Sequence, residues 1–71
     1  MPEMQFVDSS NIEAIGYDPE ARELHVRFLK SGDTYVYSNV DLAVFDELMQ
    51  ADSKGSYLNR RIKGNYPYRK L

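Results

Sequence analysis

The stretch Glu23-Leu24-His25-Val26-Arg27-Phe28 alternates polar and apolar side chains without interruption. A period of two residues is typical of a β-strand that is buried on one face. Leu24, Val26 and Phe28 therefore form a predicted core face, and the polar residues between them point to the other side. The fold is predicted outward from this strand.

Turn signals on both sides of this strand predict two antiparallel neighbours. Upstream, residues 11–18 are rich in apolar side chains and end at Asp18-Pro19, because proline cannot continue a ladder. Gly16 within that segment indicates a bulge or a close backbone approach. Downstream, Gly32 suits a tight hairpin, and a third strand is predicted over residues 34–38. Strands joined by such short links form an antiparallel meander.

After the third strand, the hydrophobic period changes to that of a helix. The apolar side chains on one half of the helical wheel are Leu42, Val44, Phe45, Leu48, Met49 and Ala51. Asp41 lies at or near the N-terminus of this predicted helix, where a carboxylate interacts favourably with the free backbone N–H groups. A second, shorter helix is predicted after residues 53–56 and up to about Lys63. Leu58 and Ile62 are its buried pair, and Gly64 ends it.

These elements define an α+β domain with a three-stranded antiparallel meander sheet followed by two helices packed on one face. A chain of 71 residues supports a single domain over residues 1–71, with an ordered core over about 7–68. Residues 1–9 are expected to be a lead-in, and residues 66–68 an extended tail.

Composition excludes several classes of function. The chain has no cysteine and one histidine, which argues against a disulfide framework and a thiolate zinc site. We therefore expect no metal and no cofactor. No apolar run approaches the roughly 20 residues that span a bilayer, so no membrane partner is expected. The first residues lack the basic and apolar regions of a signal peptide, which favours a cytoplasmic location.

The formal net charge of −2 hides a strong segregation of charge along the chain. Residues 1–52 hold all 11 acidic residues and three basic ones, a net charge of −8. Residues 53–71 hold six basic residues and no acid, a net charge of +6. The boundary coincides with the predicted break between the two helices.

The basic C-terminal segment is the strongest candidate for a binding surface. Lys and Arg side chains replace phosphate counterions, and aromatic rings stack on the bases of single strands. The candidate RNA-binding residues are Lys54, Tyr57, Arg60, Arg61, Lys63, Tyr66, Tyr68, Arg69 and Lys70. The alternative is that these tyrosine rings pack on the core, while the Lys and Arg side chains form ion pairs with acidic residues of the same domain, such as Asp46 or Glu47.

Other candidate groups favour a structural role. Tyr35 and Tyr37 share one face of a strand, as in an RNA-stacking sheet, but burial of both rings is favoured because strands prefer tyrosine. His25 is expected to be solvated or at an edge. Ser9 and Ser10 show no sign of a strained nucleophile turn or an oxyanion hole. We predict no enzymatic activity and no small-molecule substrate.

The ordered set of motifs resembles the KTSC domain, a short module named after the C-terminus of some lysyl-tRNA synthetases. The resemblance covers about residues 7–68 and includes Tyr35-Val36-Tyr37 at its centre. The other motifs that carry it are Ile15-Gly16-Tyr17-Asp18, Leu24-x-Val26-x-Phe28 and Ser53-Lys54-Gly55-x-Tyr57-x-Asn59-x-x-Ile62. One departure is Asp41, where the family often has proline at the helix start.

This resemblance implies a small accessory domain that binds RNA, with tRNA suggested by the attachment of the module to a tRNA-charging enzyme. Together with the charge pattern, it favours RNA binding through the basic C-terminal surface. The alternative is a protein–protein interaction module that uses the free face or edge of its sheet and has no role with nucleic acids.

Overall fold

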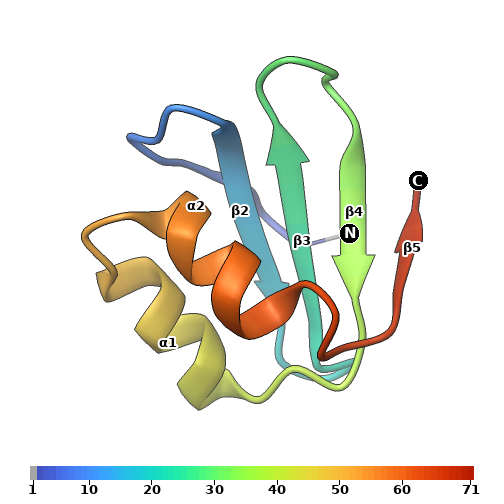
Figure 1. The fold of residues 1–71 in the computed structure, drawn as a ribbon. Helices are drawn as coiled ribbons and strands as arrows, with labels where there is room; N and C mark the ends of the chain where they lie inside the picture. The colour runs from blue at the N-terminus through green and yellow to red at the C-terminus, as the bar shows by residue number, and fades with distance from the viewer. Residues whose placement is uncertain (1) are drawn as a thin grey trace.

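Residues 2–71, which the computed structural model describes, form a five-stranded antiparallel sheet with helices on one face (Figure 1). The strands follow one another across the sheet in sequence order. They are β1 (Gln5–Phe6), β2 (Ile12–Asp18), β3 (Glu23–Phe28), β4 (Thr34–Tyr37) and β5 (Tyr68–Lys70). Between β4 and β5 lie α1 (Leu42–Gln50), α2 (Lys54–Tyr57) and the π-helical segment η1 (Leu58–Ile62). The predicted α+β class and the central three-stranded meander are confirmed.

The predicted number of strands was wrong, because the sheet has a further short strand at each edge. In β1, Phe6 pairs with Ala14 of β2, and in β5, Tyr68 pairs with Tyr37 of β4. These strands have two and three residues, and all five residues are exposed. Such short, exposed strands show no alternation of buried and exposed positions, so periodicity could not reveal them.

The core lies between the sheet and the helices. Its fully buried side chains come from both layers: Ile12, Ile15, Leu24, Val26, Tyr37, Val40, Leu48, Leu58 and Ile62. The predicted pair from the second helix is therefore confirmed. Leu42 was wrongly assigned to the apolar stripe of α1, since it is 55% exposed at the first position of that helix.

The helical connection between α1 and β5 starts with a side-chain cap and ends with a glycine. The Ser53 hydroxyl accepts a hydrogen bond from the backbone N–H of Ser56, 3.3 Å away, at the start of α2. The wider η1 turn follows directly, and its last hydrogen bond joins the Lys63 N–H to the Leu58 carbonyl at 2.8 Å. Gly64 then adopts a φ of +83°, a left-handed conformation that suits glycine at a helix end.

Gly16 allows the N-terminal segment to cross the outer face of the sheet. A Cβ atom there would lie 2.7 Å from Met4 Sδ and 2.9 Å from the backbone oxygen of Glu3. The predicted close approach is thus confirmed, while the bulge in β2 lies earlier, between Ile12 and Ala14.

Gly55 gives a prediction about packing between α2 and the start of β2. A glycine-to-alanine change in an exposed helix normally stabilises by about 1 kcal/mol. Here the new Cβ would meet the Asn11 amide, with Cγ and Nδ2 at 3.1 Å and Oδ1 closer still. We therefore expect Gly55→Ala to destabilise the domain by about 1–3 kcal/mol in urea unfolding. The matched control is Ser56→Ala, at an exposed position in the same helix. A variant Gly55→Ala as stable as that control would contradict the packing described.

Candidate nucleic-acid interface

An open aromatic pocket of about 670 Å³ lies on the helix side of the sheet, at β4 and β5. The helices lie in front of β2 and β3 in Figure 1 and leave this part of the sheet uncovered. The residues that line the pocket are Phe28, Ser31, Asp33, Tyr35, Tyr37, Lys63, Gly64 and Tyr68. Four of these eight side chains are aromatic, so the pocket is suited to stacking against a flat group.

The four rings of the pocket form a continuous series. Phe28 and Tyr35 meet edge to face, with ring centroids 5.6 Å apart. Tyr68 lies against both Tyr35 and Tyr37, at 5.6 and 5.9 Å. Tyr37 is buried, Tyr35 is half-buried, and Tyr68 is 63% exposed. The prediction that both tyrosines of the Tyr-x-Tyr motif are buried is therefore confirmed for Tyr37. For Tyr35 it is confirmed only in part, because part of this ring is exposed in the pocket.

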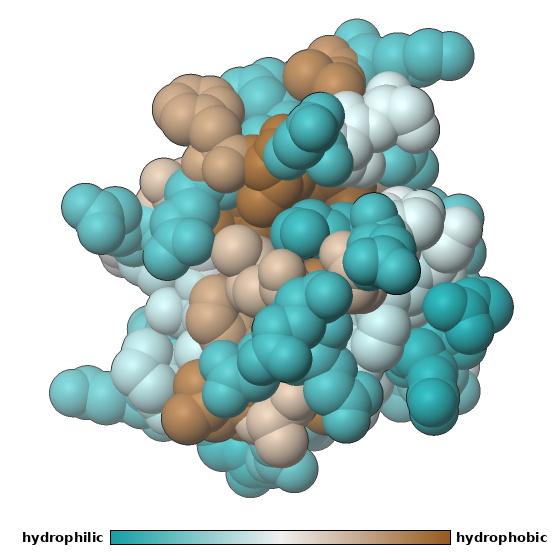
Figure 2. Space-filling view, turned by 90° about the vertical axis from the view of Figure 1, so that its left-hand side faces the viewer, coloured by the Kyte–Doolittle hydropathy of each residue, from teal (hydrophilic) through white to brown (hydrophobic). Residues whose placement is uncertain are grey.

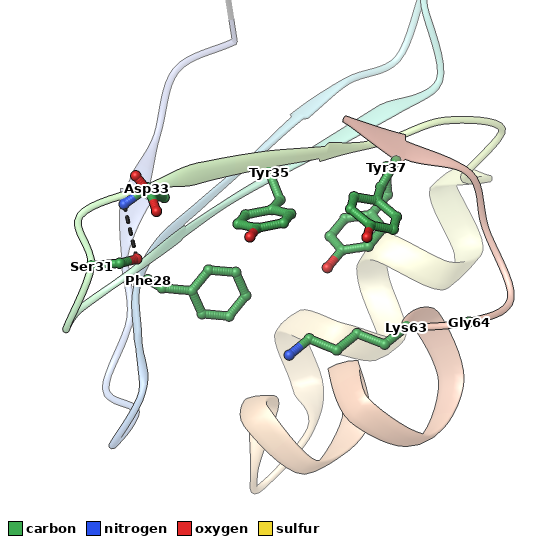
Figure 3. A pocket seen from close by; sticks show the side chains of 8 residues that line it. Phe28, Ser31, Asp33, Tyr35, Tyr37, Lys63 and Gly64 are labelled. Carbon is green, nitrogen blue, oxygen red and sulfur yellow. Dashed lines mark hydrogen bonds between the residues drawn. The ribbon is translucent and has the colours of Figure 1, made fainter. Parts of the chain in front are cut away.

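Lys63 crosses the pocket from the end of η1. Its side chain extends toward the ring of Phe28, and Nζ lies 5.2 Å from the ring centroid (Figure 3). A cation at that distance from an aromatic centroid is attracted to the ring. The side chain leaves the helix at the residue where the π-helical turn closes, immediately before Gly64. The wide turn and the glycine thus set where this ammonium group lies.

Arg60 and Arg61 add two positive charges on η1. Both side chains are exposed, and neither forms an ion pair within the described part of the chain. Together with Lys63 they form a cationic group, here called the η1 cations. Intramolecular neutralisation, the alternative to a binding surface, does not account for these three residues.

The two basic residues of β5 are neutralised within the domain. Arg69 Nη1 lies 3.1 Å from Glu23 Oε2, and Lys70 Nζ lies 3.5 Å from Asp33 Oδ2. Arg69 pairs in register with Val36, so it is on the outer face of the sheet, opposite the pocket. For these two residues, the structure agrees with the alternative prediction that the basic residues form ion pairs with acidic residues of the same domain.

The other predicted site residues lie apart from the pocket. The Tyr57 hydroxyl donates to Glu47 Oε1 on α1 at 2.7 Å, and burial together with this bond raises its pKa to about 12. Lys54 Nζ donates to the Ala51 carbonyl at 3.3 Å. Tyr66 is half-buried and packs against the core. Of the nine candidates, the structure brings only Lys63 and Tyr68 together in the pocket.

Four lining residues were not among the site candidates that the sequence suggested: Phe28, Ser31, Asp33 and Gly64, the last predicted only as the end of a helix. Phe28 reads from its alternation as an ordinary core residue, and Ser31 and Asp33 read as turn residues. The pocket forms because β5 lies beside β4. The residue pattern of a single strand does not predict this pairing.

His25 is buried on the outer face, which contradicts the expectation of a solvated histidine. Its side chain lies in a row with Gly16 and Val36 and is 4% exposed. Neither ring nitrogen has a hydrogen-bond partner among residues 2–71, and Glu23 Oε1 is 3.9 Å from Nε2. The sequence prediction failed because the N-terminal segment covers this face next to Gly16.

Burial lowers the pKa of His25, although the nearby Glu23 carboxylate opposes this and Arg69 adds to it. The folded state then binds a proton less readily than the unfolded state, so stability is full above the ordinary histidine pKa of about 6.5 and falls below it. In the wild-type protein, the free energy of unfolding should fall as the pH is lowered from about 7.5 to about 5.5. One titrating group contributes at most about 1.4 kcal/mol per pH unit to this fall, and we expect His25→Phe to make the fall smaller. Urea unfolding at several pH values measures this. Equal pH dependence in both proteins would contradict it.

Residues 2–71 hold neither a candidate metal site nor a candidate membrane span. They contain no group of three or more His, Cys, Asp or Glu side chains placed to hold a metal ion. None of the helices in this range is long and apolar enough to cross a membrane.

The fold and the pocket define a class of protein: a small α+β domain with an open aromatic pocket that is also lined by the lysine Lys63. Residues 8–66 match the family model described as the KTSC domain. The chain therefore belongs to the KTSC family, as its ordered motifs indicated.

Relatives of the chain include both small proteins and a much larger enzyme. A protein of Tsukamurella paurometabola is 46% identical over 63 residues, which cover 89% of this chain and 92% of that protein. The crystal structure of a KTSC domain protein from Yersinia pestis matches with a TM-score of 0.95 and 39% identity, covering 100% of this chain and 99% of that one. A lysine–tRNA ligase of a Nostoc species is 41% identical over 64 residues, which are 90% of this chain but 11% of the ligase.

Proposed function

We propose that this protein is a non-enzymatic RNA-binding domain whose contact surface is the aromatic pocket together with the η1 cations. The observation that carries the proposal is the position of Lys63, which brings an ammonium group into a pocket lined by four rings. Phosphate attraction and base stacking are the two interactions that single-stranded nucleic acid needs, and here one surface offers both. A domain of this kind would act in the cytoplasm.

The charge distribution supports this placement. Arg60, Arg61 and Lys63 are exposed and lie within four consecutive residues, at the end of η1 and directly after it. The protein as a whole has a net charge of −2, so RNA would be repelled from much of the remaining surface. Binding would thus be oriented by local charge. The relationship to part of a lysine–tRNA ligase makes tRNA a reasonable first RNA to test.

The alternative of a protein-interaction module has weaker support. A peptide could add to the edge of β5, but that strand has three residues and carries Arg69 and Lys70, and charged residues discourage edge pairing. The face on the side of the α1–α2 connection carries both hydrophilic and apolar side chains (Figure 2).

The proposal is tested by titrating the protein with a fluorescently labelled, unstructured RNA and with unfractionated tRNA. We expect binding at low salt that weakens as salt rises, with a slope of log K against log salt of about −2, because about three cations contact phosphate at about 0.7 each. A double-stranded DNA, similar in length to the labelled RNA, serves as a third ligand for comparison. Failure to bind either RNA at about 50 mM salt would overturn the proposal, because electrostatic binding is strongest there.

A further inference from the structure

We propose that the aromatic pocket takes one unpaired nucleobase of an RNA strand, with Lys63 against a neighbouring phosphate. This inference rests on the proposed RNA-binding function and adds to it the part of the RNA that is recognised. It makes the domain a reader of single-stranded RNA.

The lining of the pocket fits a flat ring. Phe28, Tyr35 and Tyr68 present partly or largely exposed rings to the pocket, and Phe28 and Tyr35 also pack against the buried core. Tyr68 in particular leaves 63% of its surface exposed on an edge strand. A base that entered would cover apolar surface that the domain alone leaves open to water. The volume of about 670 Å³ lies within the range of about 300–1,000 Å³ that is usual for small-ligand pockets.

The polar groups of the pocket suit hydrogen bonds to a base edge. Among the tyrosines of residues 2–71, the hydroxyls of Tyr17 and Tyr57 are hydrogen-bonded within the domain. The hydroxyls of the pocket tyrosines remain available to a ligand (Figure 3). Burial raises the pKa of Tyr37, and the adjacent Tyr35 and Tyr68 add to this, so its phenol stays a donor at neutral pH.

Charge favours a nucleotide over other flat or apolar occupants. Asp33 is the only acidic side chain that lines the pocket within the described residues, and Lys70 pairs with it at 3.5 Å. The charge left without a partner is the ammonium of Lys63, so the site attracts an anionic group next to the ring. A proline-rich peptide would also fit an aromatic groove but brings no phosphate.

A paired base could not enter this site. The bases of an RNA duplex are stacked and their edges are engaged, whereas single-stranded bases can be splayed out and stacked on aromatic side chains. The pocket therefore predicts a preference for single strands, which the η1 cations alone would not give.

The test compares three ligands on the intact protein: a labelled single-stranded RNA of about eight nucleotides, the same RNA in a duplex, and an abasic ribose-phosphate oligomer of equal length. We expect the single strand to bind about tenfold more tightly than either of the others, since loss of stacking at one base has about that effect. Equal affinity for the abasic oligomer would overturn the inference and leave the proposed function standing. Absence of binding to all three would overturn both.

Variants locate the effect in the pocket. Tyr68→Ala should lower affinity for the single strand about tenfold with no change in its salt dependence, and Tyr68→Phe should restore most of it because the ring is kept. Phe6→Ala is the matched control, since Phe6 is 77% exposed on β1, away from the pocket. Circular dichroism of each variant checks the fold. Full RNA affinity of a folded Tyr68→Ala variant, or an equal loss of affinity in Phe6→Ala, would contradict the inference. Binding of a proline-rich peptide in the pocket that RNA does not displace would contradict it as well.

Discussion

Reversing the charge of both arginines of η1, in Arg60→Glu with Arg61→Glu, is expected to lower the affinity for single-stranded RNA by at least about a hundredfold at low salt. Both side chains are exposed and unpaired within residues 2–71, so their replacement removes phosphate contacts without breaking an ion pair of the fold. The salt slope should fall by about 1.4, which corresponds to two lost contacts. Fluorescence anisotropy at several salt concentrations measures both quantities.

The control for this prediction replaces an arginine on the opposite face of the sheet with an uncharged residue. Arg69→Gln removes one positive charge from the outer face, where Arg69 is engaged by Glu23. We expect RNA affinity to change by less than about twofold, because the Arg69 side chain lies on the face opposite the pocket and is already paired with Glu23. An equal loss in Arg69→Gln, or unchanged affinity in the double variant, would place RNA binding elsewhere.

The second large effect is expected from Leu58→Ala, at the start of η1. Leu58 is fully buried between the helical layer and the sheet, so the change leaves a cavity and costs about 2–5 kcal/mol. That loss is a large part of the stability of so small a domain. The melting temperature should fall by more than about 10 °C in thermal unfolding followed by circular dichroism.

The control for Leu58→Ala is the same substitution at Leu42, which is 55% exposed. Because Leu42 buries little apolar surface, its replacement should change stability by less than about 0.5 kcal/mol. If Leu58→Ala were as stable as Leu42→Ala, η1 would not pack on the sheet as described.

The sequence was sufficient for the central part of the fold. The alternation in β3 and the turn residues around it predict three strands, and the change to a helical period predicts α1 and the helix after it. Leu58 and Ile62 are buried as their spacing indicates. The edge strands β1 and β5 could not be predicted, because they are short and fully exposed, and β5 in addition pairs with a strand on the far side of the helical segments.

The candidate site was predicted only in part, for the same physical reason. A charge pattern along the chain identifies Arg60, Arg61 and Lys63 as cations, but the return of β5 to β4 decides which of the basic residues meet an acid. That return also brings Tyr68 beside Tyr35 and Tyr37 and opens the pocket onto Lys63. His25 shows the opposite case, since a polar position in an alternating strand is buried by a segment that carries little periodicity.

The most direct test of RNA binding at the pocket is a titration of the ¹⁵N-labelled protein with a short single-stranded RNA, followed by amide chemical shifts. We predict that the largest shifts occur at Tyr35, Lys63, Gly64 and Tyr68, with Arg60 and Arg61 also affected. Shifts centred instead on β1 and the adjacent part of β2, around Phe6 and Gly16, without shifts at the pocket residues, would contradict this account.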